Sequence, residues 1–230
     1  MPVARKKSAP PVAKRRAPRP DGQATRDHLV ETAGLVIAER GYADSTGKEI
    51  CQRAGVPLAS INYHFGGRDG LYEAVLIAAH QQLVALDDLV TMVEGIDDPA
   101  ERLRTVLIHL VRLTTRPAAP WGLRVLLREV LAPSAALSAL IEKAVRPKAM
   151  FLRGLVAGVM KLPPEHPSVQ RGLVFTILPC LTLMIIPKQA PARLVPAAAK
   201  GAEGMGDDLV LYAMAGLDAL ARAHTGRRKR

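Results

Sequence analysis

Cysteine and long apolar runs are both scarce in this chain of 230 residues. Its two cysteines, Cys51 and Cys180, stand alone and far apart, which argues against a disulfide framework and a structural zinc site. The longest uncharged stretch, residues 172–187, contains a proline and is shorter than the roughly 20 residues that cross a membrane. We interpret it as a buried core or interface helix, with a membrane segment as the alternative. Without an apolar segment after the N-terminal charges, no secretory signal is predicted, and we expect a cytoplasmic protein without membrane contact.

Signatures of catalysis are also lacking. The sequence contains no G-x-S-x-G elbow, no P-loop and no H-E-x-x-H pair. The glycines of GAEGMG, residues 201–206, fall in an expected loop and not between a strand and a helix, so they do not predict a dinucleotide site. We therefore expect no enzyme activity, no cofactor and no metal ion.

Positive charge is concentrated at the two ends of the chain. The net charge is +11, yet outside the first 20 and last four residues the basic and acidic residues balance at 21 each. Residues 1–22 are mostly Pro, Ala, Lys and Arg without apolar periodicity, which predicts a disordered basic arm. Residues 226–230 form a short basic tail. The basic residues of the arm are Arg5, Lys6, Lys7, Lys14, Arg15, Arg16 and Arg19.

Helical periodicity dominates the rest of the chain, and we predict an all-α fold of about nine helices. In residues 23–70, a helix over 24–40 precedes two short helices over 46–53 and 57–65. Thr46 and Glu49 have the spacing of a capping box. Residues 71–225 form a larger helical domain, with a loop over 187–206. Its helices are expected over 69–92, 98–115, 121–131, 134–160 with a break or kink at Pro147, 167–186 and 207–224.

A supporting helix followed by two short helices and a glycine-containing turn is typical of a helix-turn-helix, whose second helix enters the DNA major groove. The inner face of this unit carries Ile50, Ala54, Val56, Ile61 and Phe65. The outer face of its last helix carries side chains able to contact bases, methyl groups or phosphates: Leu58, Ala59, Ser60, Asn62, Tyr63 and His64.

The string GYADSTGKEICQRAGVPLASINYHFGGRDGLYEAVL, residues 41–76, resembles the DNA-binding signature of the TetR/AcrR family of transcriptional regulators. INYHFGGRDGLY also resembles the CerR/CecR-type subgroup, as does LLREVLAPSAAL at 126–137. The resemblance implies DNA contacts by Thr46 and Lys48, by Ser60, Asn62, Tyr63 and His64, and a phosphate contact by Arg68. Asn62 and Pro57 depart from the family pattern, so the base preference does not carry over.

Each of these assignments has an alternative that involves no contact with DNA. Tyr63 is either a DNA contact or a packing aromatic, His64 a contact or a solvated surface histidine, and Asn62 a base contact or a residue facing water. Residues 21–70 carry five basic and seven acidic residues, unusual for a DNA-binding unit. We therefore hypothesise that the arm, residues 5–19, supplies phosphate or minor-groove contacts, with a solubilising tail as the alternative.

The resemblance also implies a homodimer with a pocket for a small effector. Dimer candidates are the helix over 167–186 and five residues of the last helix, with monomer core as the alternative: Leu209, Leu211, Met214, Leu217 and Leu220. Pocket candidates are the adaptable aromatic, thioether and similar side chains, although such residues are more often core: His109, Trp121, Met150, Phe151, Cys180 and Met184.

The function we expect is that of a repressor that binds a palindromic operator in double-stranded DNA as a dimer. An apolar effector would tilt the long helix that begins near Asp69, so that the dimer no longer meets both half-sites. The alternative is an architectural protein that binds DNA nonspecifically through its basic tails.

Overall fold

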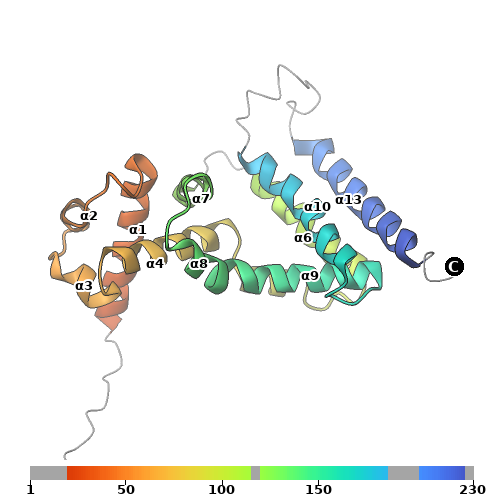
Figure 1. Ribbon diagram of the computed structural model, residues 1–230, viewed down its shortest axis with the longest axis horizontal. Coiled ribbons are helices and arrows are strands. Elements are labelled where there is room, and N and C mark those ends of the chain that lie inside the picture. Colours follow the sequence, from red (N-terminus) through yellow and green to blue (C-terminus); the bar gives the residue numbers. More distant parts are fainter. Residues whose placement is uncertain (1–19, 115–119, 186–201, 226–230) are drawn as a thin grey trace, which may run out of the picture.

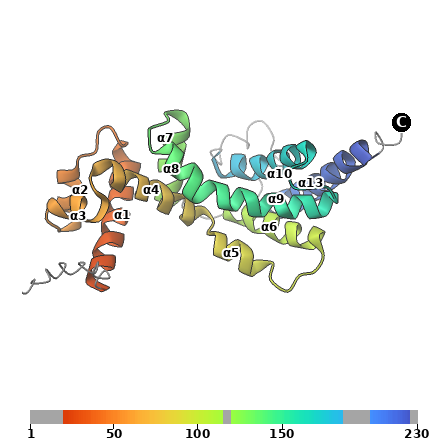
Figure 2. The ribbon, with the colours of Figure 1, turned by 60° about the horizontal axis from the view of Figure 1, so that its bottom comes forward.

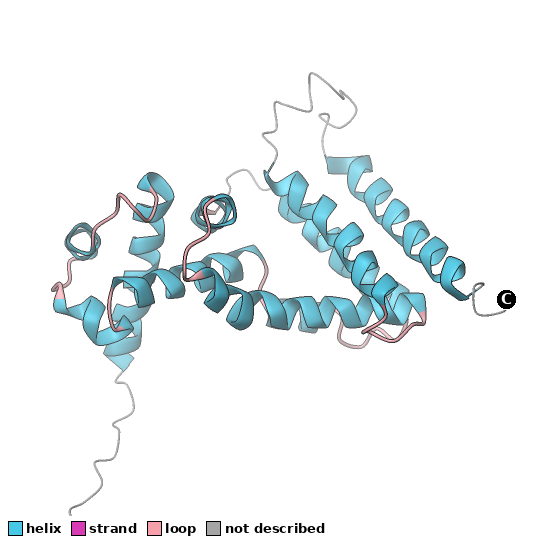
Figure 3. Cartoon of the chain, in the orientation of Figure 1, coloured by secondary structure: helices cyan, strands magenta, loops and turns pink. Residues whose placement is uncertain are grey.

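The computed structural model describes residues 20–114, 120–185 and 202–225, and helices are the only regular elements among them (Figure 3). This confirms the predicted all-α class. The helices form an elongated molecule, with α1 (Pro20–Arg40), α2 (Gly47–Ala54) and α3 (Ala59–Phe65) at one end (Figure 1).

Local signals set both ends of α2 and the end of α3 as the sequence predicts, whereas α3 begins at Ala59 and not at Pro57. The Thr46 hydroxyl caps α2 by accepting the N–H of Glu49 at 3.1 Å. The second half of the capping box is not formed, because the Glu49 carboxylate pairs with Arg40 and Arg53 instead. Gly55 ends α2 with a φ of 67°, in the left-handed region where glycine carries no steric penalty.

The single helix expected over residues 69–92 is wrong. The chain forms α4 (Arg68–Leu83) and α5 (Leu86–Met92), separated by Val84 in an extended conformation. Arg68–Met92 is long and apolar enough, with a mean hydropathy of 1.2, to cross a membrane by length and composition alone. The break at Val84 and the single buried face of α4, made by Leu71, Tyr72, Val75, Leu76 and Ala79, favour a helix that packs on the core with one side.

The later helices follow the predicted order with shifted ends. They are α6 (Pro99–Thr114), α7 (Trp121–Leu131), α8 (Leu137–Leu140), the π-helical turn η1 (Ile141–Val145), α9 (Arg146–Met160), α10 (Pro167–Ile185) and α13 (Ala202–Thr225). The chain is helical without interruption from Leu137 to Met160, and the irregularity expected at Pro147 takes the form of the π-helical turn η1, which lies directly before the first turn of α9 that contains Pro147. Residues 202–206, expected in a loop, belong to α13; the rest of that loop lies outside the described residues.

Buried side chains gather in two cores. The first core joins α1–α4 to α7, α8 and η1, so apolar packing continues past residue 70 into the expected second domain. The second core joins α5, α6, α9, α10 and α13. Helix α4 lies between the two groups of helices (Figures 1 and 2), and residues at its C-terminal end face the second core.

Candidate functional site

The outer face of α3 is open to solvent. Ile61 points inward and is buried, whereas Tyr63 is 84% exposed and therefore is not a packing aromatic of the core. Leu58, Ala59 and Asn62 are exposed as well, and Ser60 and His64 are half-buried. The Tyr63 ring meets the His64 ring edge-on, with 4.8 Å between their centres. The structure thus brings the predicted α3 contacts together on one surface.

Thr46 and Lys48 lie exposed at the start of α2. Thr46 already caps that helix, so its hydroxyl has a structural role as well as the DNA role that the resemblance implies. The arm residues Arg5, Lys6, Lys7, Lys14, Arg15, Arg16 and Arg19 lie outside the described residues. Contacts to DNA by any of these residues stay predictions.

Arg68 is engaged within the protein. Its guanidinium stacks on the Tyr42 ring at 4.1 Å and donates a hydrogen bond to the Tyr42 carbonyl, so it fixes the loop between α1 and α2. A phosphate contact by Arg68 stays a prediction. The Tyr42 hydroxyl donates to Asp69, and burial together with this bond raises the pKa of Tyr42 to about 12.

A buried polar chain continues from Tyr42 into α7. The Tyr42 and Tyr72 rings stack with centres 4.0 Å apart, and the Tyr72 hydroxyl donates to Glu129 at 2.7 Å. Glu129, only 1% exposed, also accepts the N–H and the hydroxyl of Ser134, both at 2.9 Å. Burial and the hydrogen bond to Glu129 raise the pKa of Tyr72. The hydroxyls of Tyr72 and Ser134 and the carboxylate of Glu129 all have hydrogen-bond partners, and such pairing stabilises a buried polar network.

Trp121 ties α7 to α1. Its indole N–H donates to Glu31 at 2.8 Å, and its ring lies so close to Gly34 that a Cβ there would come within 2.5 Å. Trp121 is therefore part of the first core, and the predicted pocket residue lies away from the cavity described next.

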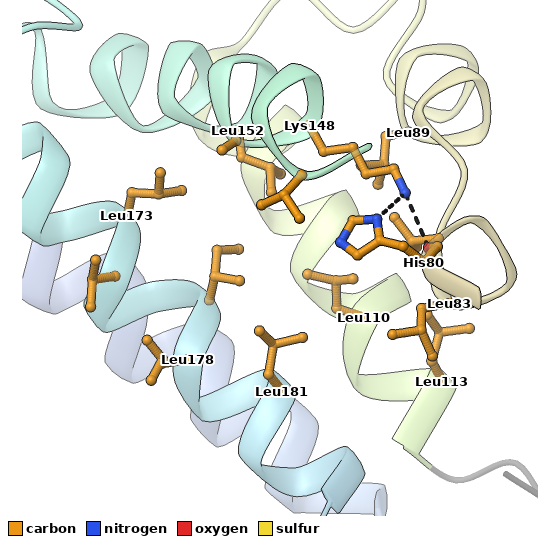
Figure 4. Close-up of a pocket in the computed structure, with 15 residues that line it drawn as sticks. His80, Leu83, Leu89, Leu110, Leu113, Lys148, Leu152, Leu173, Leu178 and Leu181 are labelled. Atoms are coloured by element: carbon orange, nitrogen blue, oxygen red, sulfur yellow. Dashed lines mark hydrogen bonds between the residues drawn. The ribbon is translucent and has the colours of Figure 1, made fainter. Parts of the chain in front are cut away.

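A cavity of about 250 Å³ lies among α4, α5, α6, α9 and α10. Figure 4 shows leucines from each of these helices around it. Apart from two polar residues its lining is wholly aliphatic: Leu83, Val84, Leu89, Leu110, Leu113, Val145, Ala149, Leu152, Leu173, Val174, Ile177, Leu178 and Leu181.

The two polar residues of the cavity wall are His80 and Lys148. The Lys148 ammonium donates to Nδ1 of His80 at 2.8 Å and to the His80 carbonyl at 3.1 Å (Figure 4). Burial lowers the pKa of Lys148 to about 8. Burial, and secondarily the charge of Lys148, lower the pKa of His80 to about 4, so the imidazole is neutral at pH 7.

The candidate pocket residues chosen from the sequence do not line this cavity. Cys180 is fully buried in the second core, where its thiol donates to the Thr176 carbonyl and burial raises its pKa to about 11. Met150 is exposed, Phe151 is half-buried against the second core, and His109 is half-buried on α6. The side chain of Met184 lies outside the described part of the structure.

Sequence reasoning missed this cavity because it looked for aromatic and sulfur-containing residues. The signal that was available is Lys148, a lysine among the apolar residues of the helix over 146–160. A lysine on a buried helix face is uncommon and needs a partner.

Helices α10 and α13 lie side by side (Figures 1 and 2), and some of their apolar side chains are exposed to solvent. The exposed side chains are Val174, Phe175, Leu178, Leu181, Leu211 and Tyr212. Of the predicted dimer residues, Leu217 is only 2% exposed and belongs to the second core, because it packs closely on Gly172 of α10. Leu209, Met214 and Leu220 are partly buried against the same core.

Within the described ranges, no cluster of three or more His, Cys, Asp or Glu residues is arranged to hold a metal ion.

Comparison with known protein families finds two matching regions. Residues 29–75 match the model for bacterial regulatory proteins of the tetR family, and residues 99–208 match the C-terminal domain of the HTH-type transcriptional dual regulator CecR. Among curated proteins, the chain is similar to the HTH-type transcriptional regulator BetI 1 of Chromohalobacter salexigens, with 36% identity over 84 residues, covering 36% of this chain and 40% of the relative. It is also similar to the regulator AcrR of Shigella flexneri, with 27% identity, covering 41% and 43%. The chain thus matches about two fifths of the length of these relatives.

Solved structures share the fold over most of the chain. A putative transcriptional regulator from Pseudomonas aeruginosa PAO1 superimposes with a TM-score of 0.66 at 17% identity, covering 90% of this chain and 95% of the other. AibR, solved with isovaleryl coenzyme A and operator DNA, gives a TM-score of 0.58 at 21% identity, covering 81% and 96%. At these identities the likeness concerns the fold.

Proposed function

Because the chain belongs to the TetR family, with a tetR-type helix-turn-helix domain and a CecR-type C-terminal domain, we propose that it is a cytoplasmic, DNA-binding transcriptional repressor. It binds a palindromic operator as a homodimer and leaves it when a small, largely apolar effector occupies the cavity. The single observation that carries the DNA-binding part is the outer face of α3, where Tyr63 stands 84% exposed opposite the buried Ile61. An aromatic so exposed on a short helix contributes nothing to the core and is placed to touch a partner.

The proposed dimer interface is the uncovered apolar face of α10 and α13. Isolated exposed apolar residues are ordinary, but several large exposed apolar side chains on two adjacent helices, some of which also line the cavity, are typical of a partner surface. Two such faces related by a two-fold axis form a four-helix contact, which places two α3 helices for two half-sites.

The proposed release mechanism uses α4. Its N-terminal end holds the helix-turn-helix through Arg68 and Asp69, which contact Tyr42, while His80 at its other end lies in the cavity wall. An effector that fills the cavity favours one position of α4, and that position sets the spacing of the two α3 helices. The AibR structure, which holds a small molecule and operator DNA, supports a ligand-responsive role for this fold.

The test is selection of bound sites from random DNA duplexes, with the full chain, Tyr63→Ala and the control Val130→Ala, whose side chain is exposed far from α3. We expect the full chain and the control to enrich one palindrome and Tyr63→Ala to lose at least tenfold in affinity for it, about 1.4 kcal/mol or more. A lack of enrichment, with binding that depends only on salt, would overturn the proposal in favour of an architectural protein acting through its basic tails.

Deleting residues 1–20 tests the basic arm separately. The proposal that the arm contacts phosphates predicts weaker binding and a flatter dependence of affinity on salt, because fewer counterions are released, with an unchanged preferred sequence. A salt slope equal to that of the full chain would show that the arm is only a solubilising tail.

A further inference from the structure

We propose that the cavity binds an amphipathic carboxylate, such as a medium-chain carboxylic acid, whose anionic head accepts a hydrogen bond from His80 and is stabilised by the charge of Lys148. The inference rests on the proposed function only for its consequence, the release of DNA. The binding site itself follows from three features of the cavity wall.

The first feature is a buried cation without a counter-ion. Lys148 is 7% exposed, and no carboxylate of the described residues lies within 4.0 Å of its ammonium. An ammonium group has three N–H donors, and two of them reach the neutral acceptors Nδ1 and the carbonyl oxygen of His80. A buried charge with only neutral partners is unfavourable, and an anion placed beside it removes that penalty.

The second feature is the orientation of His80. Since an ammonium can only donate, Nδ1 of His80 accepts, and the proton of the neutral ring is on Nε2. Figure 4 shows the second ring nitrogen of His80 on the side away from Lys148, facing the space among the leucines. A carboxylate in that space accepts the Nε2–H hydrogen bond of His80, and the Lys148 ammonium on the other side of the ring stabilises the anion by its charge; hydrogen bonds to a charged group are the strong ones.

The third feature is the rest of the wall, which is aliphatic throughout. It offers no donor to a second charge, which disfavours phosphate esters and dianions. The cavity volume of about 250 Å³ lies near the lower end of the range for small-molecule pockets, and the open side of the cavity admits the end of a hydrocarbon chain. The ligand is thus a monoanion with a short to medium hydrocarbon tail.

The experiment is calorimetric titration of the full chain at pH 7 with octanoate, 1-octanol and octylamine, which share a tail and differ in head charge. We expect octanoate to bind at least tenfold more tightly than 1-octanol, and octylamine not to bind. Lys148→Met should lose at least tenfold in octanoate affinity while keeping its affinity for 1-octanol. Lys143→Met is the matched control, because it removes an exposed lysine paired with Glu73 and should bind octanoate as the unaltered chain does.

Equal affinities for octanoate and 1-octanol would overturn the inference, as would unchanged octanoate binding in Lys148→Met. If Lys148→Met does not fold, the comparison of the three head groups in the unaltered chain still decides. A DNA-binding assay separates this inference from the proposed function. Sequence-specific DNA binding without octanoate binding overturns only the ligand assignment, whereas octanoate binding without sequence-specific DNA binding overturns only the repressor.

Discussion

In the first core the buried carboxylate of Glu129 is fully engaged by Tyr72 and Ser134, whereas in the second core the buried ammonium of Lys148 meets only neutral acceptors beside a cavity. The first core is tightly packed, since Trp121 fills the space over Gly34 and its indole N–H is hydrogen-bonded to Glu31. The second core is open, since it contains a cavity and the charge of Lys148 has no counter-ion among the described residues. On this difference we base the proposal that the first core holds the DNA-binding unit rigid and the second responds to a ligand.

Helix α4 connects these two environments within a single element. Tyr72 near its start is hydrogen-bonded into the first core, and His80 near its end carries the contact to Lys148. A displacement caused at the cavity therefore reaches the α1–α2 loop without crossing a flexible segment. Variants that damage each core separately test this proposal.

The largest effect is expected from Trp121→Ala, which disrupts the tightly packed first core. Loss of a buried tryptophan leaves a cavity and removes the hydrogen bond to Glu31, so the free energy of unfolding should fall by about 3–5 kcal/mol. Met150→Ala, at an exposed position of α9, is the control and should change it by less than about 0.5 kcal/mol. Urea unfolding measures both. A change in Trp121→Ala as small as in the control would contradict the tight packing of α7 on α1.

A smaller loss is expected from Glu129→Leu. The substitution leaves the buried hydroxyl of Tyr72 and the Ser134 N–H without their acceptor, which should lower the free energy of unfolding by about 1–3 kcal/mol. In a double-mutant cycle, Tyr72→Phe should cost less in the Glu129→Leu background than alone, because its hydroxyl no longer has a partner to lose. Strictly additive effects would show that the buried chain does not act as a network.

The opposite sign is expected in the second core. Lys148→Met replaces a buried, uncompensated cation by an apolar side chain and should stabilise the unliganded protein by about 1–3 kcal/mol. Lys143→Met, at an exposed position, should be nearly neutral. Destabilisation by Lys148→Met would mean that the charge of Lys148 is already compensated in the unliganded protein. The two cores would then no longer differ in how their buried charges are paired.

The same lysine predicts the smallest effect, a pH dependence. Its pKa is lowered from 10.5 to about 8 in the folded chain, so between these values the unfolded chain binds more protons. The free energy of unfolding should therefore rise with pH over that window, by less than about 3 kcal/mol. Below pH 8 the destabilisation of the folded chain by the buried charge is fully present. The difference in unfolding free energy between the unaltered chain and Lys148→Met, measured at pH 7.5 and 10, should shrink as the pH rises. A difference in unfolding free energy that does not change with pH would mean that Lys148 is exposed to water in the folded protein.

The helix-turn-helix was predictable from sequence because its signals are local. Thr46 caps α2, Gly55 takes the left-handed conformation and Gly66 ends α3, each within a few residues of its effect. The break at Val84 was not predictable, because no glycine or proline marks it and it follows from how α4 and α5 pack on different cores.

The cavity was beyond sequence reasoning for a related reason. Its wall is formed by residues from several helices, such as Leu113 of α6 and Leu181 of α10, and these residues are distant along the chain. Leu217 shows the converse error: its apolar spacing predicts an interface equally well as a core, and only the close approach of Gly172 decides for the core.

The central claim, that the open core controls the DNA-binding unit through α4, is tested most directly by reciprocal linkage. The measurement is the affinity of the full chain for its selected duplex with and without saturating octanoate, and its affinity for octanoate with and without saturating duplex. The account predicts that each ligand weakens the other by the same factor, at least fivefold, and that Lys148→Met abolishes both effects. Two affinities that do not depend on each other, although both ligands bind, would contradict it.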